Sequence, residues 1–404
     1  MTTLGAPHAL IVSLRNWFGA ARLPRAFRRA GFEVSTLAYP NLLLGRSRLL
    51  RAQHLLPDQG TDDELIAAAR AALSSAAPSI VIPTDDASVE LLQAVAERAR
   101  RELPDGDPLL ELLWNSLGDF RKHALLRTRQ GLANLAVELG LRAPAYAVVH
   151  DRAQAGEFVK RHGLPVVLKA EESFAGLGVS ICRDEPALDV AVERLATSNP
   201  RVLAEGALLQ QFVPGRTAMR AVVAFRGEVL GGLSAIKVET HPGSTGPSAV
   251  VEFIEHPELR ATASAMVRAL GFSGFASLDF ILDDAGAAHL IEMNSRPTPI
   301  CHLGEYLGLD LCARLKEALQ GQISADRDPT GLPKKVALFP QEWVRNASSP
   351  HFADAYHDVP WDEPELVEAF VVLARAQMRG GEWRGQETRR ERLRQTLTRG
   401  DGEA

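Results

Sequence analysis

The sequence predicts an α/β (α+β) protein in which a parallel-sheet domain precedes a larger part that mixes helices and strands. Strand and helix patterns alternate over residues 1–110, whereas strand patterns dominate between about 208 and 300. A segment rich in Pro, Asp and Gly, Leu103–Pro108, separates the two parts. The chain has 404 residues, of which 46% are hydrophobic, so it can bury a sizeable core divided among several domains.

The composition argues against several classes of protein. A net charge of −5 and a pI of about 6.2 disfavour a general nucleic-acid binder. The three cysteines are scattered without CxxC spacing, which indicates neither a disulfide framework nor a zinc site. No apolar run is long enough to span a membrane, and His8–Ser13 is too short for the core of a signal peptide. We therefore expect a cytoplasmic protein that binds neither membranes nor nucleic acid.

The first 110 residues read as a small α/β unit with a parallel sheet. The expected strands are His8–Ser13, Phe32–Leu37 and Ser79–Pro83, and the expected helices are Leu23–Ala30, Asp62–Ser75 and Ala87–Arg101. Thr61 is a suitable N-cap for the second helix. No GxGxxG motif follows the first strand, so we do not expect a dinucleotide site there.

The rest of the chain divides into three further segments. Residues 111–208 begin with an expected helix over 115–140 and continue with strands and helices around a glycine loop. Residues 209–330 are mainly strand and return to helix over 300–321. Residues 331–404 form a C-terminal extension with an aromatic stretch, a helix around 363–379 and an Arg/Glu-rich end. We expect the extension to pack on the core or on a second subunit.

Polar side chains gather on a predicted hairpin between Phe275 and Asn294. A hairpin symmetric about Ala285 and Gly286 places Asp279 directly opposite Glu292. Asn294 lies two residues beyond Glu292 and so points to the same face. Oxygen ligands of this kind suit Mg²⁺ shared with nucleotide phosphates. Arg296 follows, and its planar cation can hold a transferring phosphoryl group. The alternative is a solvated acidic face of a sheet.

A lysine followed by a glycine loop forms a second candidate feature. Lys169 closes a buried strand, and Ser173, Gly176 and Gly178 follow in a short loop whose N–H groups could approach phosphates. Lys169 would add a point charge to the same anion. The GxxxxGK[ST] motif is absent, so this is not a Walker A loop. An ordinary hairpin with an exposed lysine is the alternative.

A third feature is the strand that ends in Gln210-Gln-Phe-Val-Pro-Gly215. The Pro-Gly pair turns the chain, so the strand exit can present backbone groups and Gln210 to an adenine edge. Taken together and in this order, these elements resemble the ATP-grasp superfamily over roughly residues 110–320. The most specific match is Glu292-Met-Asn-Ser-Arg296. The resemblance implies two lobes that grip ATP, preceded by the superfamily's usual N-terminal domain.

The resemblance also assigns roles to individual residues. Lys122 and Lys169 would bind phosphates, and Ser173, Gly176 and Gly178 would form a mobile lid. Gln210 or Gln211, with the backbone of Phe212 and Val213, would face adenine. Asp279, Glu292 and Asn294 would hold magnesium, and Arg296 would steady the reaction centre. Many relatives have a glutamate at the adenine hinge and another after the hinge glycine, and this chain has neither.

The reaction that the resemblance implies is ATP-dependent ligation. Such enzymes activate a carboxylate as an acylphosphate and join it to an amine, here of amino-acid-like substrates, with release of ADP and phosphate. The expected cofactors are ATP and Mg²⁺, which Mn²⁺ could replace. Arg296 is followed by Pro-Thr-Pro-Ile-Cys and not by the Gln-x-Glu-His of the biotin-carboxylase branch, so we do not expect carboxylation. A kinase and a non-catalytic nucleotide-binding regulator stay open as alternatives.

The substrate side of the predicted site is less defined. The loop from Lys237 to Ser248 is rich in Gly and Ser and could donate backbone hydrogen bonds to a carboxylate or phosphate. We expect Arg220 or Lys237 to touch phosphate or a substrate carboxylate. His302 and Glu305 follow the metal strand, in a region that lines the acceptor pocket of similar ligases. The expected partners are small-molecule carboxylates and amines, and a homodimer would be common for such ligases.

Overall fold

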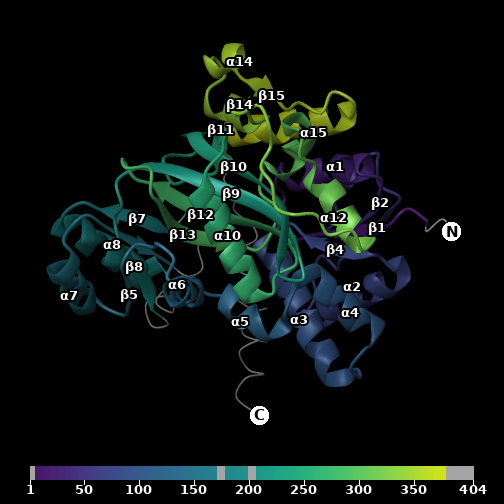
Figure 1. Cartoon of the computed structure of the whole chain (residues 1–404), viewed down its shortest axis with the longest axis horizontal. Helices are drawn as coiled ribbons and strands as arrows, with labels where there is room; N and C mark the ends of the chain where they lie inside the picture. Colours follow the sequence, from purple (N-terminus) through teal and green to yellow (C-terminus); the bar gives the residue numbers. More distant parts are fainter. Residues whose placement is uncertain (1–4, 171–177, 199–205, 379–404) are drawn as a thin grey trace.

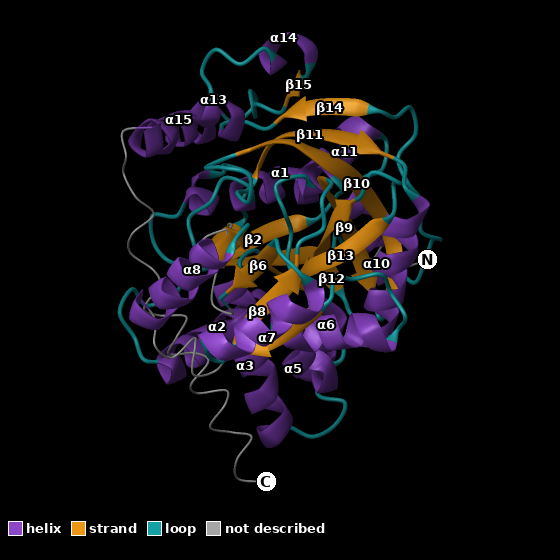
Figure 2. Ribbon diagram, turned by 90° about the vertical axis from the view of Figure 1, so that its left-hand side faces the viewer, coloured by secondary structure: helices purple, strands orange, loops and turns teal. Residues whose placement is uncertain are grey.

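The computed structural model describes residues 5–170, 178–198 and 206–378. Three sheets organise these residues: one in the N-terminal domain, one in a small lobe and a long one in a catalytic lobe (Figure 1). Turned by 90°, the molecule shows strands gathered at its centre and helices around them (Figure 2). No helix in the described ranges is long and apolar enough to cross a bilayer.

The N-terminal sheet is parallel, as predicted. Its order is β3-β2-β1-β4, with β1 (His8–Ser13), β2 (Glu33–Ala38), β3 (Ala52–Leu55) and β4 (Ile80–Pro83). The helices are α1 (Leu23–Arg29), α2 (Asp62–Ala76), α3 (Asp86–Glu102) and α4 (Pro108–Leu117). Thr61 caps α2 as expected, because its side chain accepts from the N–H of Glu64. β3 was not expected, since its mostly exposed residues carry no apolar pattern.

The single helix expected over 115–140 is wrong. α4 ends at Leu117, and η3 (Phe120–Lys122), α5 (His123–Leu126) and α6 (Arg129–Glu138) follow as separate pieces. Gly118 breaks the helix with φ +87, and a Cβ there would lie 2.4 Å from the carbonyl oxygen of Gly271. This close approach joins the linker to the catalytic lobe. A separate break after α5 lets Thr128 cap a new helix that begins at Arg129.

The small lobe is a four-stranded antiparallel sheet covered by helices on one face. Its order is β5-β8-β6-β7, with β5 (Tyr146–Val149), β6 (Val166–Lys169), β7 (Val179–Cys182), β8 (Ala207–Gln211), α7 (Arg152–His162) and α8 (Glu185–Ser198). Leu168 and Leu209 pack under the helices. By strand alternation, Lys169 and Gln210 share the opposite face. That face is therefore left to meet the catalytic lobe.

The catalytic lobe contains a seven-stranded sheet in the order β13-β12-β9-β10-β11-β14-β15. Its elements are β9 (Arg216–Phe225), β10 (Glu228–Thr240), β11 (Ser248–Ile254), α10 (Pro257–Leu270), β12 (Gly274–Leu282), β13 (Ala288–Asn294), η4 (Cys301–Leu303), α11 (Gly304–Leu307) and α12 (Leu311–Leu319). The C-terminal extension adds β14 (Lys334–Ala337), α13 (Gln341–Arg345), α14 (His351–Asp354), β15 (Tyr356–His357) and α15 (Pro364–Met378). The extension therefore packs on the core and continues the same sheet.

The two faces of the catalytic sheet have different neighbours. Met219 and Phe275 belong to a core shared with the N-terminal sheet and α12, and the rings of Phe27 and Phe275 lie 5.9 Å apart. Leu278 and Phe280 point the other way and pack with α10. Asp279 lies between them in sequence and so points, with Phe275, toward the N-terminal domain. The fold thereby places the candidate metal ligands where three parts of the chain meet.

Candidate active site

The hairpin of β12 and β13 carries the three predicted metal ligands on one face. Asp279 pairs with Glu292 across the hairpin, which confirms the predicted register. Two residues further from the turn, Asn294 pairs with Ser277. Between Asp279 and Phe280 the register shifts by one residue, so the symmetric pairing fails nearer the turn. The extra residue of this bulge is Ile291.

Each predicted metal ligand is held by a cation. Lys237 Nζ lies 3.3 Å from Asp279 Oδ1, and Arg129 Nη2 lies 3.3 Å from Glu292 Oε1. Arg296 Nη2 donates to Asn294 Oδ1 at 3.2 Å. Since these carboxylates are partly buried, the cations balance charges that would otherwise be costly. Burial raises the pKa of Asp279, Lys237 opposes that shift, and Glu292 adds to it.

Lys169 is the most deeply placed of the cations. It ends β6, its side chain is only 7% exposed, and its Nζ donates to the carbonyl oxygen of Ile291 at 3.4 Å. The bulge in the hairpin makes that carbonyl available. Burial lowers the pKa of Lys169 from 10.5 to about 8. Arg129 also acts to lower this pKa, whereas the carboxylates of Glu292 and Asp279 act to raise it. An anion placed beside this poorly solvated ammonium would be strongly attracted.

Arg129 is a site residue that the sequence analysis missed. It is the first residue of α6, where it contacts both Glu292 and the carbonyl oxygen of Ala170. Lys122, which was expected to bind phosphate, instead ends η3, and no described contact links it to the hairpin. Reading Thr128 as an N-cap would have pointed to Arg129, because Arg129 then lies at a helix N-terminus.

The expected adenine contacts are only partly available. Gln210 is buried on the same face as Lys169, whereas Gln211 is exposed. The N–H of Phe212 already donates to the carbonyl oxygen of Pro165 at 3.1 Å, so that backbone donor cannot serve a base. Val213 follows beyond the end of β8.

The expected lid lies mostly outside the described residues. Gly178 precedes β7, and its carbonyl oxygen accepts from the N–H of Ala170 at 3.1 Å. This backbone bond closes the hairpin of β6 and β7 next to Lys169. Ser173 and Gly176 are not among the residues that the structure describes.

Arg220 does not take the expected place. It pairs with Leu278 across β9 and β12 and therefore points to the α10 face, away from Asp279. Its side chain is fully buried and forms ion pairs with Asp326, at 2.9 Å, and with Asp328. Two carboxylates thus occupy the guanidinium. We correct the expectation that Arg220 meets phosphate or substrate.

His302 and Glu305 are likewise engaged elsewhere. His302 Nε2 lies 2.8 Å from Asp358 Oδ2, deep in the contact with the C-terminal extension. Glu305 forms an ion pair with Arg29 of the N-terminal domain. Both residues tie the segment after the hairpin to its neighbours. The structure therefore does not support a direct contact of either residue with an acceptor substrate.

Arg296 connects the hairpin to the N-terminal domain. Its Nε donates to Asp86 Oδ1 at 2.8 Å, and its Nη2 lies 3.4 Å from Asp86 Oδ2. Asp86 is the first residue of α3. Four cations, Arg129, Lys169, Lys237 and Arg296, thus surround the hairpin together with Asp86. The arrangement suits a highly charged anion and an oxygen-coordinated divalent cation.

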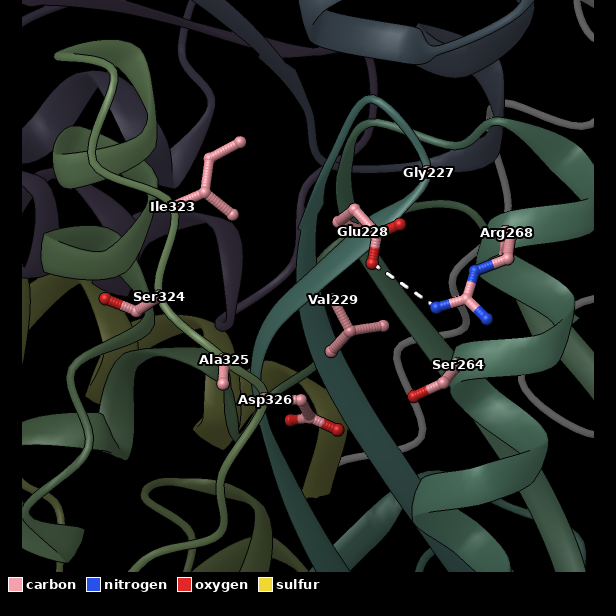
Figure 3. Close-up of a pocket in the computed structure, with 9 residues that line it drawn as sticks. All are labelled: Gly227, Glu228, Val229, Ser264, Arg268, Ile323, Ser324, Ala325 and Asp326. Carbon is pink, nitrogen blue, oxygen red and sulfur yellow. Dashed lines mark hydrogen bonds and ion pairs between the residues drawn. The ribbon is translucent and has the colours of Figure 1, made fainter.

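Among the described residues, no cluster of three or more His, Cys, Asp or Glu side chains could hold a metal. The hairpin set consists of two carboxylates and one amide, so it fits a magnesium ion that takes its other ligands from phosphates or water. A pocket of about 430 Å³ lies elsewhere, between the start of β10, α10 and residues 323–326 (Figure 3). Arg268 and Glu228 form an ion pair beside it at 3.4 Å. None of the predicted site residues lines this pocket.

The fold and the cation-lined hairpin define the class of protein. Residues 120–319 match the family model described as the RimK-like ATP-grasp domain. These residues form an ATP-grasp domain.

Curated relatives within this superfamily are carboxylate–amine ligases. The chain is 27% identical over 168 residues to a D-alanine–D-alanine ligase of Geobacter sulfurreducens, a match that covers 39% of this chain and 51% of that protein. It is 28% identical over 192 residues to a phosphoribosylamine–glycine ligase of Caulobacter vibrioides, covering 46% of this chain and 44% of that protein. The chain thus spans about half the length of the curated relatives it matches.

Solved structures show the same fold over a larger part of the chain. An L-amino acid ligase of Bacillus licheniformis superposes with a TM-score of 0.55 and 19% identity, covering 80% of this chain and 78% of that one. N5-carboxyaminoimidazole synthetase of Staphylococcus aureus, solved with ADP, gives a TM-score of 0.61 at 10% identity and covers 83% of both chains. These likenesses establish the fold.

Proposed function

We propose that this protein is an ATP-dependent ligase that activates a carboxylate as an acylphosphate and joins it to an amine, releasing ADP and phosphate. The observation that carries the proposal is the hairpin on which Asp279, Glu292 and Asn294 converge among four cations. Chemistry of this kind needs charge neutralisation and positioning more than covalent catalysis. The names of the curated relatives, all ligases, support the same reading.

Mg-ATP is the proposed cofactor, with Mn²⁺ as a substitute for the metal. Asp279, Glu292 and Asn294 would hold the metal, which would neutralise phosphate charge when bound. Arg129 and Lys169 would bind phosphate oxygens, because both lie at the junction of the small lobe and the hairpin. Glu292 would then exchange Arg129 for the metal, and Lys169 would share its N–H donors between the carbonyl oxygen of Ile291 and a phosphate oxygen.

Arg296 and Lys237 would serve the reacting end of the site. Lys237 lies on β10 next to Asp279, and the Gly/Ser-rich loop that follows β10 lies beyond it in the chain. A cation here would steady the acylphosphate while the amine attacks. Gln210 and the carbonyl groups of the strand exit would face the base, since Gln210 shares a face with Lys169. Gly178, with Ser173 and Gly176, would belong to the lid.

Small amino-acid-like carboxylates and amines are the proposed substrates. The relatives named as D-alanine–D-alanine ligase and L-amino acid ligase support this choice. We propose a division at residues 110, 211 and 330, with the last two segments sharing one sheet. The boundary expected at 208 moves to 211, because all of β8 pairs with β5 and β6 of the small lobe. We also propose a cytoplasmic enzyme, because its three cysteines are buried and unbridged, and a homodimer, which light scattering would check.

A screen of acid–amine pairs for phosphate release, with mass spectrometry of the products, tests this function. We expect ADP and an amide product only when both substrates are present. ADP that forms with a phosphorylated acid and never requires an amine would replace the ligase with a kinase. ATP binding without ADP from any mixture would favour a regulator.

A further inference from the structure

The guanidinium of Arg296 is fixed along one edge only. Asp86 accepts from Nε at 2.8 Å and lies 3.4 Å from Nη2, and Asn294 Oδ1 accepts from Nη2 at 3.2 Å. Within the described ranges Nη1 has no hydrogen-bond acceptor, and it is not among the buried unpartnered atoms. A guanidinium has five N–H donors in a rigid plane. Three of them are therefore directed at Asp86 and Asn294, and the two on Nη1 stay open.

Asp86 is itself held in place by the residue before it. Asp85 caps α3, because its Oδ1 accepts from the N–H of Ser88 at 2.9 Å. Its Oδ2 accepts from the N–H of Leu14 at 2.9 Å and of Arg15 at 3.1 Å, which ties the loop after β1 to the same point. The first turn of α3 is therefore anchored to the sheet. A carboxylate at that helix N-terminus is also favoured by the helix dipole.

From this geometry we propose that Asp86, in the N-terminal domain, is a positioning residue that sets which edge of Arg296 faces the reacting phosphoryl group. The inference rests on the proposed ligase function. Arg296 lies two residues beyond Asn294, the last residue of β13, where the backbone no longer pairs with β12 and a long side chain would have several rotamers. The bidentate contact with Asp86 selects one of them before the substrates arrive. It also keeps the cation from collapsing onto Glu292, two residues from Asn294.

This arrangement assigns a task to the N-terminal domain in the chemistry. The domain shares a core with the Asp279 face of the sheet, so Asp86 is a rigid reference for Arg296. Preorganised donors of this kind act through the rate of reaction rather than through the affinity for ATP. Loss of Asp86 should therefore lower kcat and leave the KM for ATP nearly unchanged. A purely structural role would lower stability and would not separate the two constants.

The test compares D86N with D63N in the full-length protein. Asp63, on α2, forms an exposed ion pair with Arg98 of α3, the helix that begins at Asp86. D63N is therefore the matched control. We expect kcat for ADP formation to fall about 10- to 100-fold in D86N, with the KM for ATP changed less than about threefold. D63N should behave as wild type. In a cycle with R296K, the double variant should lose no more than R296K alone, because Asp86 acts through Arg296.

The possible outcomes separate this inference from the proposed function. An active wild type with an unaltered D86N, or with additive losses in the cycle, would overturn the role of Asp86 and leave the ligase standing. If wild type forms no ADP with any substrate pair, the proposed function fails. In that case NMR of the Arg296 Nε–H, whose resonance is assigned by its absence in R296K, tests the positioning role without turnover. Slow solvent exchange in wild type that D86N abolishes supports the positioning role, and fast exchange in wild type refutes it.

Discussion

Replacing Lys169 with methionine should make the protein more stable and weaken its binding of ATP. Burial lowers the pKa of the Lys169 ammonium from 10.5 to about 8. At about 1.4 kcal/mol for each pH unit, its charge costs the folded state about 3 kcal/mol at neutral pH. Methionine removes that cost and also the hydrogen bond to Ile291, worth about 1 kcal/mol. We therefore expect a net gain of about 2 kcal/mol in the free energy of unfolding at pH 7.

The gain should depend on pH in a defined direction. Between pH 8 and 10.5 the unfolded wild type binds more protons than the folded protein, because the folded pKa of Lys169 is the lower one. The stability of wild type therefore rises with pH across this window, and the advantage of the variant shrinks. Below about pH 8 the ammonium is charged in both states, so the full difference persists.

Urea unfolding of wild type and K169M at several pH values measures this difference. K160M is the control, since Lys160 is an exposed lysine of the same lobe that pairs with Glu157. Saturating Mg-ATP, at about 100 times its Kd, should add about 2.7 kcal/mol to wild type and less to K169M. A K169M that is less stable than wild type at pH 7, or a difference that stays constant up to pH 10.5, would refute the reasoning.

Three further substitutions test the site and the correction made to it. Glu292→Gln should retain the fold and lower ADP formation at least about 100-fold, measured by phosphate release, through loss of a metal-binding carboxylate; unchanged turnover contradicts the metal assignment. Arg129→Met should weaken ATP binding about tenfold by calorimetry, whereas Met at the exposed Arg142 should not; equal affinities remove Arg129 from the site. Arg220→Met should cost roughly 3 kcal/mol in urea unfolding, because Asp326 and Asp328 lose a fully buried cation and keep only the more exposed Arg260. The KM for ATP should not change; a raised KM would restore Arg220 to the site.

Predictability differed between local and long-range features. The pairing of Asp279 with Glu292 was predicted, although the strands next to the turn pair one residue out of the assumed symmetric register and the bulge at Ile291 restores it further along. The bulge at Ile291 was not, since bulges depend on what lies against the strand, here Lys169 of another lobe. The break at Gly118 was missed for a similar reason, because its cause is the backbone of Gly271.

The cations illustrate where sequence reasoning stops. Lys169 and Lys237 were expected near the phosphates or the substrate, and both lie beside the hairpin. Arg220 was equally plausible by position in the chain, yet the pairing of β9 with β12 turns it to the other face. Arg129 and Asp86 were not predicted as site residues, because neither belongs to a motif. Each acquires its place only when separate elements pack together.

By itself the sequence determined the parallel N-terminal sheet, the strand–turn–strand with its three oxygen ligands, and the superfamily, because periodicity, turn chemistry and motif order act over short distances along the chain. Only the tertiary structure decided which cations reach those ligands, that β14 and β15 extend the catalytic sheet, and that Asp86 holds Arg296. The physical reason is that an ion pair requires two side chains within a few ångströms. Residues far apart in sequence meet that requirement only through the pairing of strands and the packing of domains.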